Sequence, residues 1–151
     1  MKEDIIMSRE ELEKKAFDYY NTGFCCSEAL SKTIIDHFAE KPDGYPVKVA
    51  SAFCGGIGGT KEDICGAMTG AVIAVGYLYG RTEEGKDLSS TRTIISEFRK
   101  QFLEAFGSTN CALILEKLGE QEKSIKCKQL TAKATGMLSD ILVQTKSKQI
   151  D

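Results

Sequence analysis

The chain has 151 residues, of which 42% are hydrophobic and 28% are charged, and its formal net charge is −2. This length and composition are typical of one globular domain with a sizeable core, so we expect a single domain over residues 1–151. The small negative charge gives no general attraction to nucleic acid or to anionic membranes, and we expect neither as a partner.

The N-terminal segment and the most apolar run indicate where the protein resides. Residues 1–15 are charged and have no apolar core, which is unlike a signal peptide. The most apolar run, residues 64–79, is shorter than the roughly 20 residues that a membrane span needs. We therefore expect a buried helix there, no membrane span, and a cytoplasmic protein.

Helix signals follow one another along the first half of the chain. A capping-box pattern at Ser8 and Glu11 predicts a first helix that stops near Asn21. Apolar residues spaced four apart predict a second helix over about 24–39. A proline suited to the first helical position predicts a short third helix over about 46–53.

The second half of the chain is also predicted to be helical. Thr60 with Asp63 predicts a helix that runs to about residue 79, and a long helix is expected over about 90–106. Two more helices are predicted to begin near Ser108 and Ser124. No pair of strand candidates is found, so the predicted fold is an all-α, compact bundle of about six or seven helices.

Six cysteines stand out, and four of them follow residues that favour the start of a helix. Ser or Thr stands three to five residues ahead of each of these four: Thr22 before Cys26, Thr60 before Cys65, Ser108 before Cys111, and Ser124 before Cys127. Such residues are preferred N-caps, and the helix dipole favours the thiolate form of a cysteine in the first turn. Thiolates attack disulfides and bind metals, so the pattern indicates sulfur chemistry.

Two glycines follow the second of these cysteines within a predicted helix. Gly66, Gly70 and Ala74 recur every four residues and leave one helix face nearly bare. Each glycine costs about 1 kcal/mol relative to alanine, so a compensating contact with another helix or a small ligand is expected. Because Cys65 begins this face, we predict that Gly66 and Gly70 bind a cofactor.

The segment Cys54–Thr60 holds four glycines in five residues, which permits positive φ angles and forbids a regular element. It lacks the Gly-Lys-Ser/Thr ending of a phosphate-binding loop. We interpret this glycine loop as a flexible gate over the cysteines or as a sharp turn.

The four cysteines occur in a recognisable order: Cys26 in Cys-Ser-Glu-Ala-Leu, Cys65 in Cys-Gly-Ala-Met-Thr-Gly, then Cys111 and Cys127. This order resembles the redox-active proteins of the C_GCAxxG_C_C family over about residues 11–142. The resemblance implies a small helical protein with redox-active cysteines. A similar four-cysteine domain accompanies haem in some cytochromes, which suggests an iron–sulfur centre as one use. Cys25 and Cys54 lie outside the pattern and have no assigned role.

Chemistry permits three uses of these thiols. They can shuttle between dithiol and disulfide as the catalytic residues of a thiol oxidoreductase, hold a [2Fe–2S] cluster or a zinc ion, or be inert core residues of a helical adaptor. We favour the first use slightly over the second, and both assign the same four residues: Cys26, Cys65, Cys111 and Cys127. Cys111 is expected to attack first, because no carboxylate follows it until Glu116.

The sequence does not name the partner of these cysteines. A redox partner protein and a small molecule both remain open, and the cofactor is a [2Fe–2S] cluster, a zinc ion or none. The single histidine excludes a histidine-rich metal site. The apolar face of the helix over about 90–106 fits either a homodimer contact or burial in the core.

Overall fold

The computed structural model describes residues 6–150, and these form seven α-helices and one short 3-10 helix. The elements are α1 (Arg9–Asn21), α2 (Cys26–Phe38), α3 (Tyr45–Ala50), η1 (Ser51–Phe53), α4 (Gly66–Tyr79), α5 (Ser89–Phe106), α6 (Cys111–Leu118) and α7 (Ile125–Ile150). The described residues contain no strand, and the prediction of an all-α fold is confirmed.

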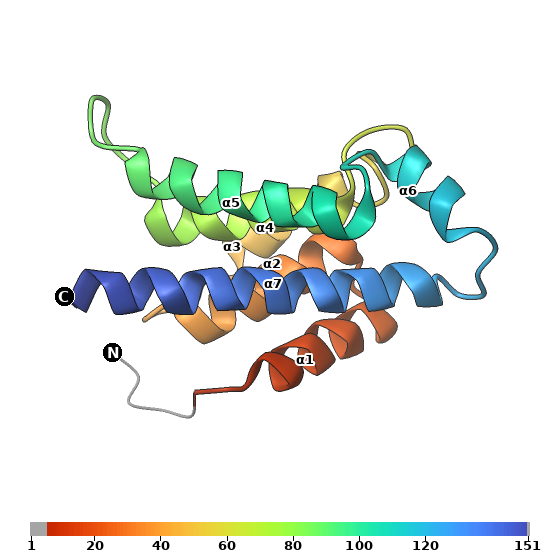
Figure 1. Ribbon diagram of the computed structural model, residues 1–151, viewed down its shortest axis with the longest axis horizontal. Coiled ribbons are helices and arrows are strands. Elements are labelled where there is room, and N and C mark those ends of the chain that lie inside the picture. The colour runs from red at the N-terminus through yellow and green to blue at the C-terminus, as the bar shows by residue number, and fades with distance from the viewer. Residues whose placement is uncertain (1–5, 151) are drawn as a thin grey trace.

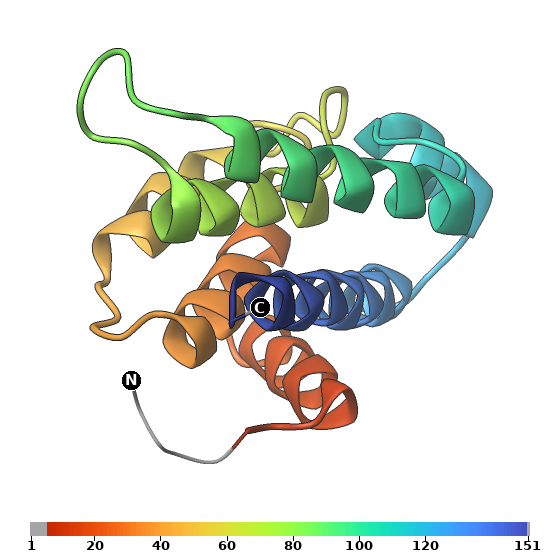
Figure 2. The same ribbon diagram turned by 60° about the vertical axis from the view of Figure 1, so that its left-hand side comes forward.

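Helices α2 and α7 lie at the centre of the bundle. α2 packs against α1, α3, α4 and α7, whereas α7 packs against α1, α2, α4 and α5 (Figures 1 and 2). The two aromatic side chains that fill the core from α5, Phe98 and Phe102, are fully buried. Their burial shows that core packing uses this face of α5, while the homodimer contact stays a prediction.

The first helix begins as predicted. The Glu11 N–H donates to Ser8 Oγ (3.1 Å) and the Ser8 N–H donates to Glu11 Oε2 (2.8 Å), which is a complete capping box. Thr22, predicted to precede the start of α2 as a cap, instead closes α1, since its hydroxyl donates to the Asp18 carbonyl (2.8 Å). The N-cap of α2 is Cys25.

Helix α4 starts later than its sequence predicts. Thr60 was expected to open it, but the helix begins at Gly66 and Cys65 is its N-cap. The Thr60 hydroxyl donates to the Gly56 carbonyl (2.7 Å) inside a turn, and Lys61 has a φ of 61°. The glycine loop therefore continues to Ile64, because several successive residues in the left-handed region turn the backbone away from a helical path.

The last two helices begin close to their predicted positions. Asn110, two residues after Ser108, caps α6 by accepting from the Leu113 N–H (3.1 Å). The Ser108 hydroxyl accepts from the Asn110 N–H (3.0 Å), so it shapes the turn ahead of the cap. Ser124 directly precedes α7, as expected.

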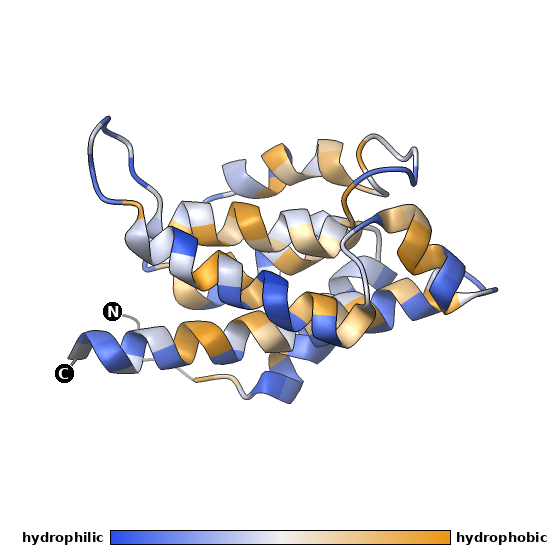
Figure 3. Cartoon of the chain, turned by 45° about the horizontal axis from the view of Figure 1, so that its top comes forward, coloured by the Kyte–Doolittle hydropathy of each residue, from blue (hydrophilic) through white to orange (hydrophobic). Residues whose placement is uncertain are grey.

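Helix α7 is the longest element, and its hydropathy changes along its length. Apolar positions lie in its middle, and polar positions dominate its C-terminal end (Figure 3). None of the helices in the described part of the chain is both long and apolar enough to pass through a bilayer.

Candidate functional site

Four helix starts meet at one end of the bundle, and each carries a cysteine. Cys26 is the first residue of α2, Cys65 directly precedes α4, Cys111 is the first residue of α6, and Cys127 lies in the first turn of α7. These starts lie at the right-hand end of the molecule in Figure 1. All four cysteines line one cavity of about 320 Å³, which we call the cysteine pocket. The structure thus brings together every cysteine that the sequence singled out.

The two motif glycines hold α4 against the start of α2. A Cβ atom built on Gly66 would collide with Cys26 Sγ, and one built on Gly70 would lie 2.6 Å from the Ser27 carbonyl oxygen. Of the two glycines, only Gly66 lines the cysteine pocket. Helix packing therefore compensates the cost of Gly70, while the predicted cofactor-binding role of both glycines stays a prediction.

A short antiparallel pairing fixes Cys65 relative to Cys111. The Cys65 N–H donates to the Thr109 carbonyl (2.7 Å), and the Cys111 N–H donates to the Asp63 carbonyl (2.7 Å), around a bridge between residues 64 and 110. Both cysteines then point to the same side as diagonal neighbours, whose Cα atoms are typically about 7–8 Å apart. A disulfide usually joins Cα atoms about 4.4–6.8 Å apart, which is shorter than this typical spacing.

Gln121 organises the start of α7 around Cys127. Its Oε1 accepts from the N–H groups of Lys126 (2.8 Å) and Cys127 (3.0 Å), and its Nε2 donates to Cys127 Sγ (3.2 Å). The turn between them has positive φ at Lys123 (50°) and Ser124 (58°), which lets the Gln121 side chain reach the helix start. The sequence carried no signal for Gln121, because it lies outside the usual capping positions.

The charged residues that line the pocket are all basic. Lys61 and Lys123 line it, and none of the lining residues is Asp, Glu or His. Burial raises the pKa of the Cys111 thiol, and the nearby Lys61 lowers it in part. The two lysines therefore place positive charge beside the thiols, which favours their thiolate form.

Burial outweighs the helix dipole at the two deepest thiols. Desolvation raises the pKa of Cys26, although the N–H groups of Gly55 and Ser27 lower it in part. Desolvation also raises the pKa of Cys65 to about 12. The expected preference for thiolate at these helix starts is therefore reversed in the absence of a cation, and both thiols are protonated at neutral pH.

Two further residues that line the cysteine pocket, Tyr20 and Thr131, were not predicted from the sequence. Burial and the neighbouring thiols of Cys26 and Cys127 raise the pKa of the Tyr20 hydroxyl. Thr131 is 1% exposed, and within residues 6–150 its Oγ1 is the one buried side-chain nitrogen or oxygen atom without a hydrogen-bond partner. A buried polar atom left unpaired costs free energy, and a polar group bound within reach of Thr131 Oγ1 would remove that cost.

The sulfur positions distinguish between kinds of bound metal. A tetrahedral zinc with bonds of about 2.3 Å holds its sulfurs about 3.8 Å apart. In the described part of the chain, no three pocket thiols have their sulfurs all within 4.8 Å of one another. The pocket is therefore too wide for a single zinc ion as it stands, whereas a binuclear cluster distributes four thiolates over two irons. Four thiols are the donor set of such a cluster.

The raised pKa values predict an order of thiol reactivity. In reduced, metal-free protein at pH 8, iodoacetamide is expected to label Cys111 faster than Cys65. Labelling of Cys65 should be slower than in the denatured chain by roughly a hundredfold or more, because only the thiolate reacts. Its rate should rise about tenfold per pH unit up to about pH 12, since that is the folded pKa of Cys65. Site-resolved mass spectrometry checks this, and equal rates at both cysteines would contradict it.

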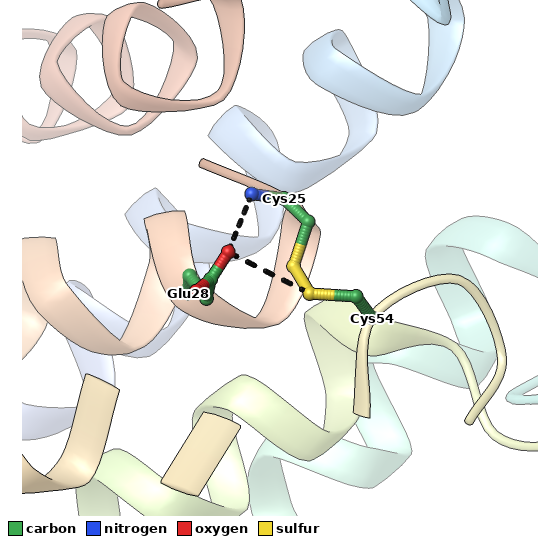
Figure 4. Close-up of side chains that lie close together, drawn as sticks. All are labelled: Cys25, Glu28 and Cys54. Atoms are coloured by element: carbon green, nitrogen blue, oxygen red, sulfur yellow. Dashed lines mark hydrogen bonds between the residues drawn. A yellow bond between two sulfur atoms is a disulfide. The ribbon is translucent and has the colours of Figure 1, made fainter. Parts of the chain in front are cut away.

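The two remaining cysteines form a disulfide beside the pocket. Cys25 and Cys54 are bonded through their sulfurs, with Cα atoms 5.8 Å apart (Figure 4). Neither residue has a role that is predicted from the sequence, and pairing of this kind cannot be deduced from sequence alone. The one feature of the sequence that sets these two cysteines apart is that both lie outside the four-cysteine pattern.

Comparison with known families gives one match. Residues 24–141 match the model of a family described as "Putative redox-active protein (C_GCAxxG_C_C)", and this match covers most of the chain. No curated protein and no solved structure matches the chain.

Proposed function

The chain belongs to the C_GCAxxG_C_C family, and we propose that its cysteine pocket is a redox centre that holds a [2Fe–2S] cluster and transfers electrons. One observation carries the proposal: four thiols from four separate helix starts surround one cavity, and none of the four is bonded to another. Four cysteine thiolates are the usual ligands of a [2Fe–2S] cluster.

The electrostatics of the pocket support a bound cation rather than free thiols. Cys26 and Cys65 have raised pKa values because they are buried, so each needs a positive charge to become a thiolate. Coordination to iron supplies that charge. Four thiolates around the cluster core leave a net negative charge, which Lys61 and Lys123 offset from the rim.

The surrounding residues would tune and orient the cluster ligands. When bound, a [2Fe–2S] cluster supplies one-electron transfer, and hydrogen bonds to the sulfurs raise its reduction potential. The Gln121 amide donates to Cys127 Sγ (3.2 Å), and the N–H of Gly55 lies close enough to Cys26 to lower its pKa. The Thr131 hydroxyl offers one more donor from the pocket wall.

Thiol–disulfide exchange is the second candidate, favoured by the half-buried position of Cys111. The Cys111 thiolate would attack a substrate disulfide, forming a mixed disulfide and releasing one substrate thiolate. The Cys65 thiolate would then attack Cys111 Sγ and release the second thiol. The two protein thiols thereby give two electrons to the substrate. Because diagonal neighbours on such a pairing typically have Cα atoms farther apart than a disulfide spans, we expect this resolving step to involve movement of the backbone.

Anaerobic purification, followed by iron, sulfide, zinc and thiol analysis of one sample, tests the proposal. We expect a coloured protein with about two iron and two sulfide ions per chain, and a paramagnetic signal on one-electron reduction. The Cys65→Ser variant should lose most of the iron, whereas the matched double variant Cys25→Ser/Cys54→Ser should keep it.

The same double variant separates the candidates. Because it lacks the Cys25–Cys54 disulfide, any thiols that appear on reduction must come from the pocket. A colourless protein whose thiol count rises by two or four would overturn the cluster and support exchange. A colourless protein with an unchanged count and no metal would overturn both.

A further inference from the structure

A second group of sulfur and oxygen ligands lies outside the cysteine pocket, where α2 meets η1. Cys25 is the N-cap of α2, Glu28 lies in the first turn of that helix, and Cys54 directly follows η1. All three residues are half-buried. Figure 4 shows the Glu28 carboxylate facing both the Cys25 backbone and the sulfur of Cys54.

We propose that Cys25, Cys54 and Glu28 form a zinc site that is open when the two cysteines are reduced and closed by their disulfide. The three residues take no part in the proposed redox centre, so the site adds a function to it. Two thiolates and one carboxylate are a donor set that zinc accepts, with water in the fourth position. Half-burial of the three side chains leaves access for that water.

The spacing between the carboxylate and Cys54 fits one metal ion, and the two sulfurs, bonded to each other here, would have to separate to about 3.8 Å on reduction. The ligand atoms of the three residues all lie within 4.8 Å of one another, and no other group of three His, Cys, Asp or Glu residues in the described ranges does so. Glu28 Oε1 lies 3.7 Å from Cys54 Sγ. A tetrahedral zinc with bonds of about 2.1 Å to oxygen and 2.3 Å to sulfur separates two such ligands by roughly 3.6 Å.

Hydrogen bonds already hold the carboxylate in place. The Cys25 N–H donates to Glu28 Oε1 (3.0 Å), and the Ser51 hydroxyl donates to Glu28 Oε2 (2.7 Å). A carboxylate has about four acceptor sites, so these bonds leave room for a metal. The Ser27 hydroxyl lies 3.4 Å from the sulfurs of both Cys25 and Cys54. Such outer contacts orient metal ligands in known sites.

The two states interconvert by a balanced reaction. An external dithiol gives two electrons to the Cys25–Cys54 bond, which breaks, and the dithiol leaves as a disulfide. The two protein thiols then release two protons to water as zinc binds. In the reverse direction, a small-molecule disulfide takes two electrons from the two thiolates and two protons from water and leaves as two thiols, and zinc is released.

The full chain is first reduced with a phosphine, which is then removed. Titration of this protein with zinc, in competition with a chromophoric chelator, tests the proposal. The reduced protein is expected to bind one more zinc ion than the reduced Cys25→Ser/Cys54→Ser variant. The protein that carries the Cys25–Cys54 disulfide should lack this extra ion. Glu28→Gln should weaken the site about tenfold or more, while circular dichroism confirms that each variant is folded.

The difference between the two proteins isolates this site, because both contain the same cysteine pocket. Co²⁺ in place of Zn²⁺ should give a thiolate-to-cobalt absorption band in the reduced protein that the double variant lacks. Equal zinc counts for the two reduced proteins would overturn the site, as would an undiminished count in the oxidised protein. Neither result depends on whether the pocket holds iron, so this proposal and the proposed function fail separately.

Discussion

Replacing Gly70 with alanine is expected to destabilise the protein by about 3 kcal/mol, at the upper end of the range for overpacked cores. The new Cβ would lie 2.6 Å from the Ser27 carbonyl oxygen and 3.0 Å from Ser27 Cα, and both are backbone atoms that cannot rotate away. Relief of the clash would push α4 from α2, so the iron content should also fall. Urea unfolding and iron analysis measure the two effects.

Gly76→Ala provides the matched control on the same helix. A Cβ atom at Gly76 would meet no heavy atom within 4 Å, and the residue is exposed. We expect this variant to be more stable than the parent by about 0.5–1 kcal/mol, because alanine favours a helix over glycine. Equal effects of the two substitutions would show that Gly70 does not set the α2–α4 contact.

Phe102→Ala is expected to cost about 3–5 kcal/mol in the free energy of unfolding, since it leaves a large cavity. Phe102 is fully buried, and its ring centroid lies 5.8 Å from that of Phe98 and 4.7 Å from that of Phe106. Thermal and urea unfolding test this expectation. Leu113→Ala, at a side chain that is 56% exposed, should change stability by no more than about 0.5 kcal/mol.

The same variant separates stability from the proposed redox centre. No residue of α5 lines the cysteine pocket, so folded Phe102→Ala protein should retain its iron. Cys65→Ser should show the opposite result, with iron lost from a protein that remains folded. A Phe102→Ala protein that is as stable as the parent would contradict the core position of this side chain.

Local signals predicted the helices well where the cap lies within a few residues of the helix. The Ser8 capping box and the α5 helix that ends before Gly107, whose φ is 80°, are examples. The start of α4 depends instead on the backbone pairing of residues 63–65 with residues 109–111. That pairing joins segments distant in sequence, so no local rule at Thr60 reveals it.

The sequence predicted the four cysteines of the candidate site but not the other residues that line it. Tyr20, Gln121 and Thr131 reach the pocket from the end of α1, from the turn before α7 and from the interior of α7. Their roles follow from packing, which a periodic pattern does not encode. Burial, which depends on the whole fold, is the main cause of the raised pKa of Cys65, and a sequence pattern does not encode it.

The pairing that holds Cys65 beside Cys111 is made by main-chain groups. Asp63 and Thr109 contribute carbonyl oxygens, which every amino acid possesses, and the Ile64 side chain is 45% exposed. Substitutions at these neighbours, proline excepted, leave the two hydrogen bonds intact. The residues around the two thiols can therefore be substituted during evolution while the relative positions of the thiols are preserved.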